Sequence, residues 1–106
     1  MNIESDDYSL VELIEKGKTS DKKYRKLPIA AINGFRKAIF YMRAADNIEV
    51  LKQFKGLHYE KLKCKLKGFE SVRCNNVWRL IFKSYAKENS IIITEVKLVE
   101  ISHHYE

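Results

Sequence analysis

The first half of the chain spaces its hydrophobic residues as amphipathic helices do. Leu10, Leu13 and Ile14 recur at helical spacing. Before them, residues 5–7 are Ser and Asp, which are favoured at helix N-caps, and after them Gly17 suits a helix end. This pattern predicts a first helix, with a short edge strand before it over residues 1–4.

A longer second helix is predicted after Pro28, which suits the first turn of a helix. Its hydrophobic face repeats at intervals of three and four residues: Ile32, Phe35, Ile39 and Met42. The polar, mostly basic residues 18–26 are expected to form a solvated connector between the two helices. Asp46 or Asn47 is expected to cap a short third helix that carries Val50, Leu51 and Phe54.

Beyond Gly56 the hydrophobic period changes from helical to alternating. Lysines alternate with Leu62, Cys64 and Leu66 over one stretch: Lys61, Lys63, Lys65 and Lys67. A period of two predicts that these lysines share one face of an extended segment. There they either bind phosphate or guard a sheet edge against aggregation.

A hairpin is predicted next, because two β-rich runs, residues 69–74 and 77–85, flank Asn75-Asn76. A two-residue loop there pairs Phe69 with Phe82, and directly paired residues share a face. One face is then expected to contact the helices: Phe69, Trp78, Leu80 and Phe82. The opposite face is expected to be open: Glu70, Val72, Arg79 and Lys83.

A last strand is predicted over residues 91–99, with Ile92, Val96 and Leu98 toward the core and Glu95 and Lys97 outward. The elements together predict an α+β fold, in which two or three N-terminal helices pack on one face of a small, mainly antiparallel sheet of three or four strands. A chain of 106 residues is expected to form a single domain over residues 1–106.

The formal net charge of +6 comes from 20 Lys+Arg against 14 Asp+Glu. Basic surface gains free energy by releasing phosphate counterions, so a nucleic acid is one candidate partner and a merely solvated positive surface is the alternative.

No signal peptide or membrane-length apolar run is visible, and the two cysteines form no CxxC pair, so a cytoplasmic location is expected. His58 and the pair His103-His104 complete no known ligand spacing, so no metal or other cofactor is expected.

The polar residues of the predicted open face and the C-terminal tail suit RNA cleavage without a metal. That reaction needs a base for the 2′-OH, cations for the phosphate and an acid for the leaving oxygen. The base is left open between Glu70, a histidine and a lysine made less basic by its lysine neighbours. The candidate catalytic residues on these grounds are Glu70, Arg79, His104 and Tyr105. The candidate RNA-contacting residues are Lys61, Lys65, Lys67, Lys83 and His103.

Several segments resemble the RelE/ParE superfamily of type II toxin–antitoxin toxins, and its HigB branch most closely. They are residues 62–68 (LKCKLKG), 71–73 (SVR), 77–82 (VWRLIF) and 100–105 (EISHHY). The HigB pattern has an LKGDLKG stretch, a hairpin that ends in aromatic-Arg-hydrophobic, and a C-terminal His/Tyr tail. Cys64 and Lys65 stand where that pattern has Gly and Asp, and the tail reads His-His-Tyr where Asp-Tyr-His is common.

The resemblance implies a ribosome-dependent, metal-free mRNA endoribonuclease that uses the RNA 2′-OH as nucleophile. It also implies a cognate helix-turn-helix, HigA-like antitoxin as partner. The family lysine corresponds to Lys63, so the resemblance adds Lys63 to the candidate catalytic residues. The hairpin arginine corresponds to Arg79, and the Tyr/His pair to a part of residues 103–105. Two other functions fit the same fold: a ParE-like gyrase inhibitor and a non-catalytic RNA-binding homologue. The combination of Lys63, Arg79 and the His/Tyr tail favours the nuclease.

Overall fold

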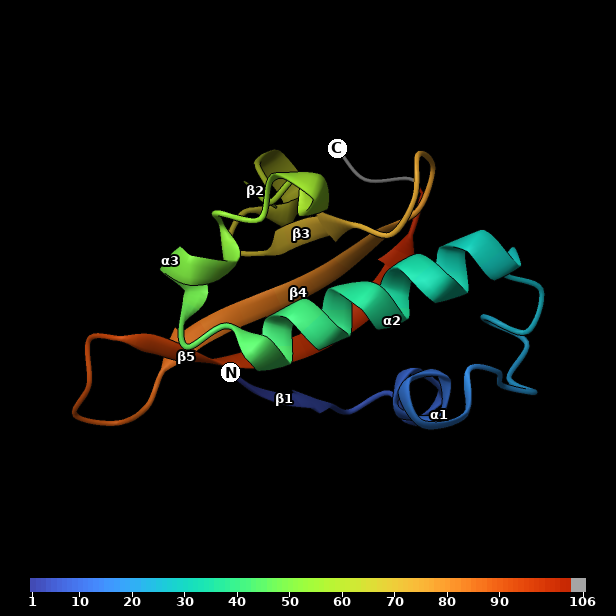
Figure 1. Cartoon of the computed structure of the whole chain (residues 1–106), viewed down its shortest axis with the longest axis horizontal. Coiled ribbons are helices and arrows are strands. Elements are labelled where there is room, and N and C mark those ends of the chain that lie inside the picture. Colours follow the sequence, from blue (N-terminus) through green and yellow to red (C-terminus); the bar gives the residue numbers. More distant parts are fainter. Residues whose placement is uncertain (104–106) are drawn as a thin grey trace.

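A computed structural model describes residues 1–103 of the chain. The helices are α1 (Tyr8–Lys16), α2 (Ile29–Ala44) and α3 (Ile48–Leu51), with short 3-10 turns η1 (Lys55–Leu57) and η2 (Cys64–Leu66). The strands are β1 (Asn2–Ser5), β2 (Glu60–Lys61), β3 (Glu70–Arg73), β4 (Arg79–Ala86) and β5 (Ile93–Ser102). They form one sheet in the order β1-β5-β4-β3-β2 (Figure 1).

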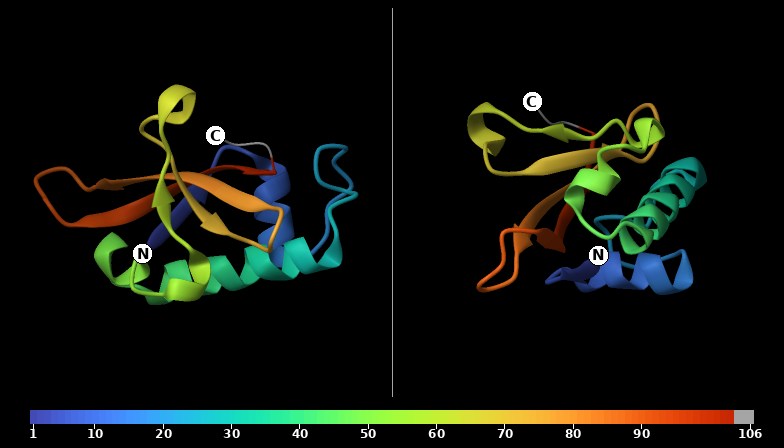
Figure 2. Two further views of the ribbon diagram at one scale, coloured as in Figure 1. Left: turned by 90° about the horizontal axis from the view of Figure 1, so that it is seen from above. Right: turned by 60° about the vertical axis from the view of Figure 1, so that its left-hand side comes forward.

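The sheet is antiparallel except where β1 pairs in parallel with β5. Helix α2 crosses one face of this sheet, and the right-hand view of Figure 2 shows the helices and the sheet as separate layers. The predicted α+β class is therefore confirmed. The sheet has five strands because the short β2, which the sequence did not separate from its lysine run, adds to the far edge.

Local sequence accounts for the ends of the helices. Asp7 caps α1, because its side chain accepts a hydrogen bond from the Ser9 amide at 3.0 Å. Gly17 ends α1 with a φ of 73°, in the left-handed region that glycine adopts readily. Asn47 caps α3 by accepting a hydrogen bond from the Val50 amide at 3.1 Å. The predicted caps of α1 and α3 are confirmed, but α3 ends at Leu51 and does not reach Phe54, as had been expected.

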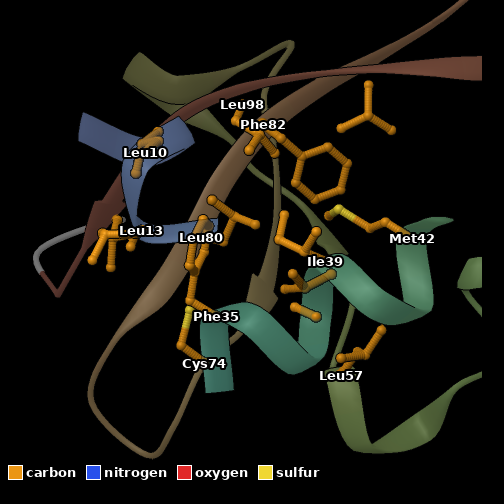
Figure 3. Packing of buried hydrophobic residues seen from close by; sticks show 14 of the residues in the cluster. Leu10, Leu13, Phe35, Ile39, Met42, Leu57, Cys74, Leu80, Phe82 and Leu98 are labelled. Carbon is orange, nitrogen blue, oxygen red and sulfur yellow. The ribbon is translucent and has the colours of Figure 1, made fainter. Parts of the chain in front are cut away.

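The hydrophobic core lies between α1, α2 and the helix-facing side of the sheet (Figure 3). The predicted face of α2 supplies Phe35, Ile39 and Met42, each 2% exposed or less. The sheet supplies the other half of the core: Val72, Leu80, Phe82, Val96, Leu98 and Ile101. The connector before α2 also contributes, because Tyr24 is buried and its hydroxyl accepts a hydrogen bond from the Ile101 amide at 3.1 Å. The expectation of a fully solvated connector was therefore wrong.

Helix α2 approaches the end of β3 so closely that Gly34 leaves no room for a side chain. A Cβ atom added at Gly34 would lie 1.6 Å from the carbonyl oxygen of Cys74. A glycine inside a helix lowers its stability relative to alanine. The structure gives the reason for a glycine here, which is backbone-to-backbone packing between α2 and the hairpin.

The β3–β4 hairpin has a register one residue away from the predicted one. Glu70 pairs with Phe82 and Val72 with Leu80. The amides of Cys74 and Asn75 both donate to the Trp78 carbonyl, so the loop holds three residues instead of two. A one-residue shift exchanges the faces of a strand.

That shift corrects several predicted orientations. Leu80 and Phe82 face the helices as predicted, but Val72 and Glu70 face them too instead of lying on the opposite face. Phe69 is on the opposite side, where the Lys83 ammonium lies 4.4 Å from the centre of its ring. We call the side of the sheet that points away from the helices the far face.

The lysine run does not form the predicted extended segment. Strand β2 ends at Lys61, and the chain then turns through η2, where Cys64 has a φ of 57° and Gly68 a φ of 96°. These left-handed conformations break an alternating strand. Cys64 thus adopts, at some cost in backbone energy, a conformation that favours the glycine of the HigB pattern.

The last strand is confirmed, but it starts later than predicted, at Ile93, and continues beyond residue 99 to Ser102. Val96 and Leu98 are buried as predicted, whereas Ile92 precedes β5 and is 56% exposed. The prediction of Ile92 as a core residue was wrong because irregular pairing at Tyr85/Ala86 shifts the register near the turn.

Candidate active site

Arg79, at the start of β4, is the centre of a hydrogen-bonded group on the far face. Its side chain is nearly buried, with the residue 7% exposed. The Nε atom donates to the Ser71 hydroxyl at 2.9 Å, and Nη2 donates to the backbone carbonyl of His58. Bonds to two different segments fix the plane of the guanidinium, which a fork of N–H donors makes possible.

Glu60 in β2 is the carboxylate nearest to this guanidinium among the described residues. Its Oε1 atom lies 4.0 Å from Nη2 of Arg79, and its side chain is 48% exposed. Glu60 pairs with Ser71 across β2 and β3, which places it on the same face as Arg79. A half-exposed carboxylate beside a fixed arginine can bind a ligand and exchange a proton with it.

Sequence reasoning missed Glu60 and selected Glu70. The cause is the hairpin register: with a three-residue loop, Ser71 shares its face with Arg79, and the residue opposite Ser71 on the next strand is Glu60. The predicted register instead put Glu70 on that face. The face on which each glutamate lies follows from the hairpin register. That register depends on the length of the loop, which Asn75-Asn76 alone does not determine.

Glu70 does not join Arg79, because it lies on the helix-facing side. Its carboxylate accepts hydrogen bonds from the Tyr59 hydroxyl at 2.5 Å, the Ser84 amide at 2.7 Å and the Ser84 hydroxyl at 2.8 Å. Burial, and then the hydrogen bond to Glu70, raise the pKa of Tyr59 well above its usual value. Glu70 therefore holds β3, β4 and the turn before β2 together.

The candidate lysines divide between two sides of the molecule. Lys61, Lys63 and Lys67 line a hollow of about 530 Å³, which also contains Glu70 and Ser84 but not Arg79. Lys65 is exposed within η2, and Lys83 is exposed on the far face. The structure therefore does not gather the predicted cations onto one surface.

The C-terminal end of β5 lies beside the start of β4, which carries Arg79. Ser102 pairs with Arg79, and the ring of His103 lies 4.3 Å from the ring of Trp78, centre to centre. The two rings are tilted by 50°, and because His103 is exposed, its ring offers an aromatic surface on which a base can stack. His104 and Tyr105 lie outside the described residues.

Within residues 1–103, no group of three or more His, Cys, Asp or Glu side chains is arranged to hold a metal ion. None of the helices in the same part of the chain combines the length and the apolar character needed to cross a membrane.

The fold is that of the RelE/ParE toxins. It resembles the YoeB/ParE toxin from Agrobacterium tumefaciens with a TM-score of 0.52 and 13% identity, covering 99% of this chain and 100% of that chain. The sequence matches the family model for the RelE-like toxin HigB of type II toxin–antitoxin systems over residues 10–97. The chain therefore belongs to the HigB-like toxin family, which implies an antitoxin partner. Comparison with curated proteins gives no match.

Proposed function

We propose that this toxin is a ribosome-dependent, metal-free endoribonuclease that cleaves mRNA in the cytoplasm and so inhibits translation. The observation that carries the proposal is the pair of Arg79 and Glu60 on the far face. A fixed, permanently charged donor stands beside a solvent-accessible carboxylate, which is the combination that attack on a phosphate needs.

In the proposed reaction, Glu60 accepts the proton of the RNA 2′-OH, and the 2′-oxygen forms a bond to the adjacent phosphorus. Arg79 stabilises the negative charge that builds on the phosphate oxygens. The bond to the 5′-oxygen breaks, and that oxygen takes a proton from an acid in residues 103–105. The products are a 2′,3′-cyclic phosphate and a 5′-hydroxyl, so atoms and charge balance.

The neighbouring side chains have supporting roles in this proposal. His103, whose ring lies against that of Trp78, stacks on a base of the substrate, and Lys83 holds a phosphate along the far face. Lys61, Lys63, Lys65 and Lys67 attract RNA over a longer range through their charge. Glu70 is left without a catalytic role, because its oxygens are occupied by Tyr59 and Ser84.

The test is induction of the toxin in cells, followed by mapping of mRNA 5′ ends. New ends within translated codons are expected for the wild type, with strong loss in Glu60→Gln and Arg79→Lys. Glu88→Gln, an exposed carboxylate in the turn before β5, is the matched control and should cut normally. A 5′-hydroxyl at each new end is expected, and an inhibitor that keeps ribosomes off mRNA should abolish the cuts. Absence of cuts together with accumulating DNA breaks would favour gyrase inhibition and reject the proposal.

A further inference from the structure

A groove runs along the helix-facing side of the molecule, beside α3. The hollow of about 530 Å³ next to the β2–η2–β3 segment and a second hollow of about 300 Å³ next to the β4–β5 turn share three lining residues, Ile48, Glu49 and Ile93. The two hollows therefore adjoin at these three residues, and we call the surface that they form together the groove. In the view of Figure 1, α3 is drawn between the turn that contains η2 and the turn that joins β4 to β5.

One end of the groove is apolar and exposed to solvent. Ile91 is 96% exposed and Ile92 is 56% exposed, and both line the smaller hollow together with Ile48 and Ile93. Large aliphatic side chains in solvent next to a concave apolar surface are typical of a protein-binding site. An RNA backbone would gain little from this end, because four isoleucines offer it neither charge nor hydrogen bonds.

The other end is basic, and its positive charge is not neutralised within the described residues. Lys61, Lys63 and Lys67 line the larger hollow, and residues 1–103 provide no ion pair to any of them. The two carboxylates of the groove are already occupied. Glu49 pairs with Lys52 at 3.1 Å, and Glu70 is bound by Tyr59 and Ser84.

We propose that this groove is the docking site of an acidic, amphipathic segment of the antitoxin. Aliphatic side chains of the segment pack against the isoleucine end, and its carboxylates lie against the three lysines. Charge complementarity together with an apolar floor distinguishes such a peptide from RNA, which would meet only the lysines. The proposal rests on membership of a toxin–antitoxin family and not on RNA cleavage, so either proposal can fail alone.

The test measures the dissociation constant between the full-length toxin and the purified product of the neighbouring antitoxin gene by calorimetry. Ile92→Asp and Lys67→Glu are each expected to weaken binding at least about tenfold, which corresponds to about 1.4 kcal/mol. Two exposed residues away from the groove provide matched controls, Ile29→Asp and Lys22→Glu, and both should bind as the wild type does. Melting temperatures of all four variants should match the wild type, because the positions are on the surface.

Salt provides a second readout. Raising the ionic strength should weaken binding of the wild type more than binding of Lys67→Glu, since the variant has lost part of the electrostatic attraction. Wild-type affinity in both groove variants would overturn the proposal, and so would equal weakening in the two controls. Unchanged antitoxin affinity with weaker binding of a short single-stranded RNA would reassign the groove to RNA and also overturn it.

Discussion

At the scale of single residues, Glu60 and Glu70 carry the same chemical group in opposite environments. Glu60 is half-exposed beside Arg79, whereas Glu70 is 8% exposed and accepts hydrogen bonds from Tyr59 and Ser84. A carboxylate of the first kind can exchange a proton with a ribose hydroxyl. One of the second kind would first have to break the contacts that hold three segments together.

This contrast predicts opposite results for two conservative substitutions. Glu60→Gln should lower mRNA cleavage by about 10²–10⁴-fold, the usual contribution of a general base, without changing the free energy of unfolding. Glu70→Gln should lower the free energy of unfolding by about 1–3 kcal/mol, because its amide group faces the Ser84 amide donor. Urea unfolding and 5′-end mapping of both variants check this. A stable Glu70→Gln protein that no longer cleaves RNA would reverse the assignment.

The buried thiol of Cys74 should make the free energy of unfolding depend on pH in the alkaline range. Burial raises the pKa of its thiol to about 12 from 9.0, although the charge of Arg79 opposes the rise. The unfolded chain therefore loses the thiol proton first, so the folded state is favoured fully below pH 9 and progressively less above it. The slope for this one group approaches roughly 1.4 kcal/mol per pH unit between pH 9 and 12.

Urea unfolding of the wild type and Cys74→Ala between pH 7 and 11 isolates this contribution. The tyrosines titrate in both proteins, so the comparison cancels them. The difference in unfolding free energy between the two proteins should be constant up to about pH 8 and shrink above pH 9. A difference that stays constant to pH 11 would contradict the buried thiol.

At the scale of secondary structure, the close approach of α2 to the hairpin makes Gly34 irreplaceable. Gly34→Ala would bring a methyl group against the backbone of Cys74, and neither backbone can yield without moving the helix. We expect a loss of unfolding free energy near the top of the roughly 1–3 kcal/mol range for over-packed cores. Thermal and urea unfolding measure it.

Gly56→Ala is the matched control for this prediction. A Cβ atom at Gly56 meets no atom within 4 Å, so its effect should stay within about 0.5 kcal/mol. Equal losses in the two variants would mean that close packing against Cys74 is not the cause of the loss in Gly34→Ala.

The helices could be predicted from local sequence, whereas the faces of the hairpin and the turn at η2 could not. Helices α1 and α2 were predictable because capping residues and hydrophobic spacing act within a few residues of each other. The hairpin faces were not, because one extra loop residue after Asn75 reverses every side chain of β3 relative to β4. The turn at η2 was also missed, since a non-glycine residue at positive φ, Cys64, leaves no local signal.

In the candidate site, one residue was placed correctly from the sequence and one was missed. Arg79 was predicted correctly on the face away from the helices, because its parity within β4 follows from Leu80 and Phe82 alone. Glu60 was missed because its position depends on two successive strand registers, β4 to β3 and β3 to β2. Long-range pairing of this kind is fixed by packing of the whole sheet and not by the neighbours in sequence.

At the scale of the whole molecule, the sheet separates two surfaces. Arg79 and Glu60 lie on the far face, and the groove beside α3 lies on the helix-facing side. Strand β2 connects them, because Glu60 and Lys61 are neighbours that point to opposite faces. Substitutions on one surface that remove no lysine should therefore leave the function of the other largely intact, as is usual for sites without shared contacts.

This separation predicts a toxin that escapes its antitoxin while it still cleaves RNA. Cells that produce the antitoxin should survive induction of the wild type but stop growing on induction of Ile92→Asp, with mRNA cuts at the same positions. The double variant Ile92→Asp/Glu60→Gln should be harmless, which shows that the growth arrest needs the far face. Neutralisation of Ile92→Asp as complete as that of the wild type would mean that the antitoxin docks elsewhere. Loss of cutting in Ile92→Asp would mean that the two surfaces are coupled through the sheet.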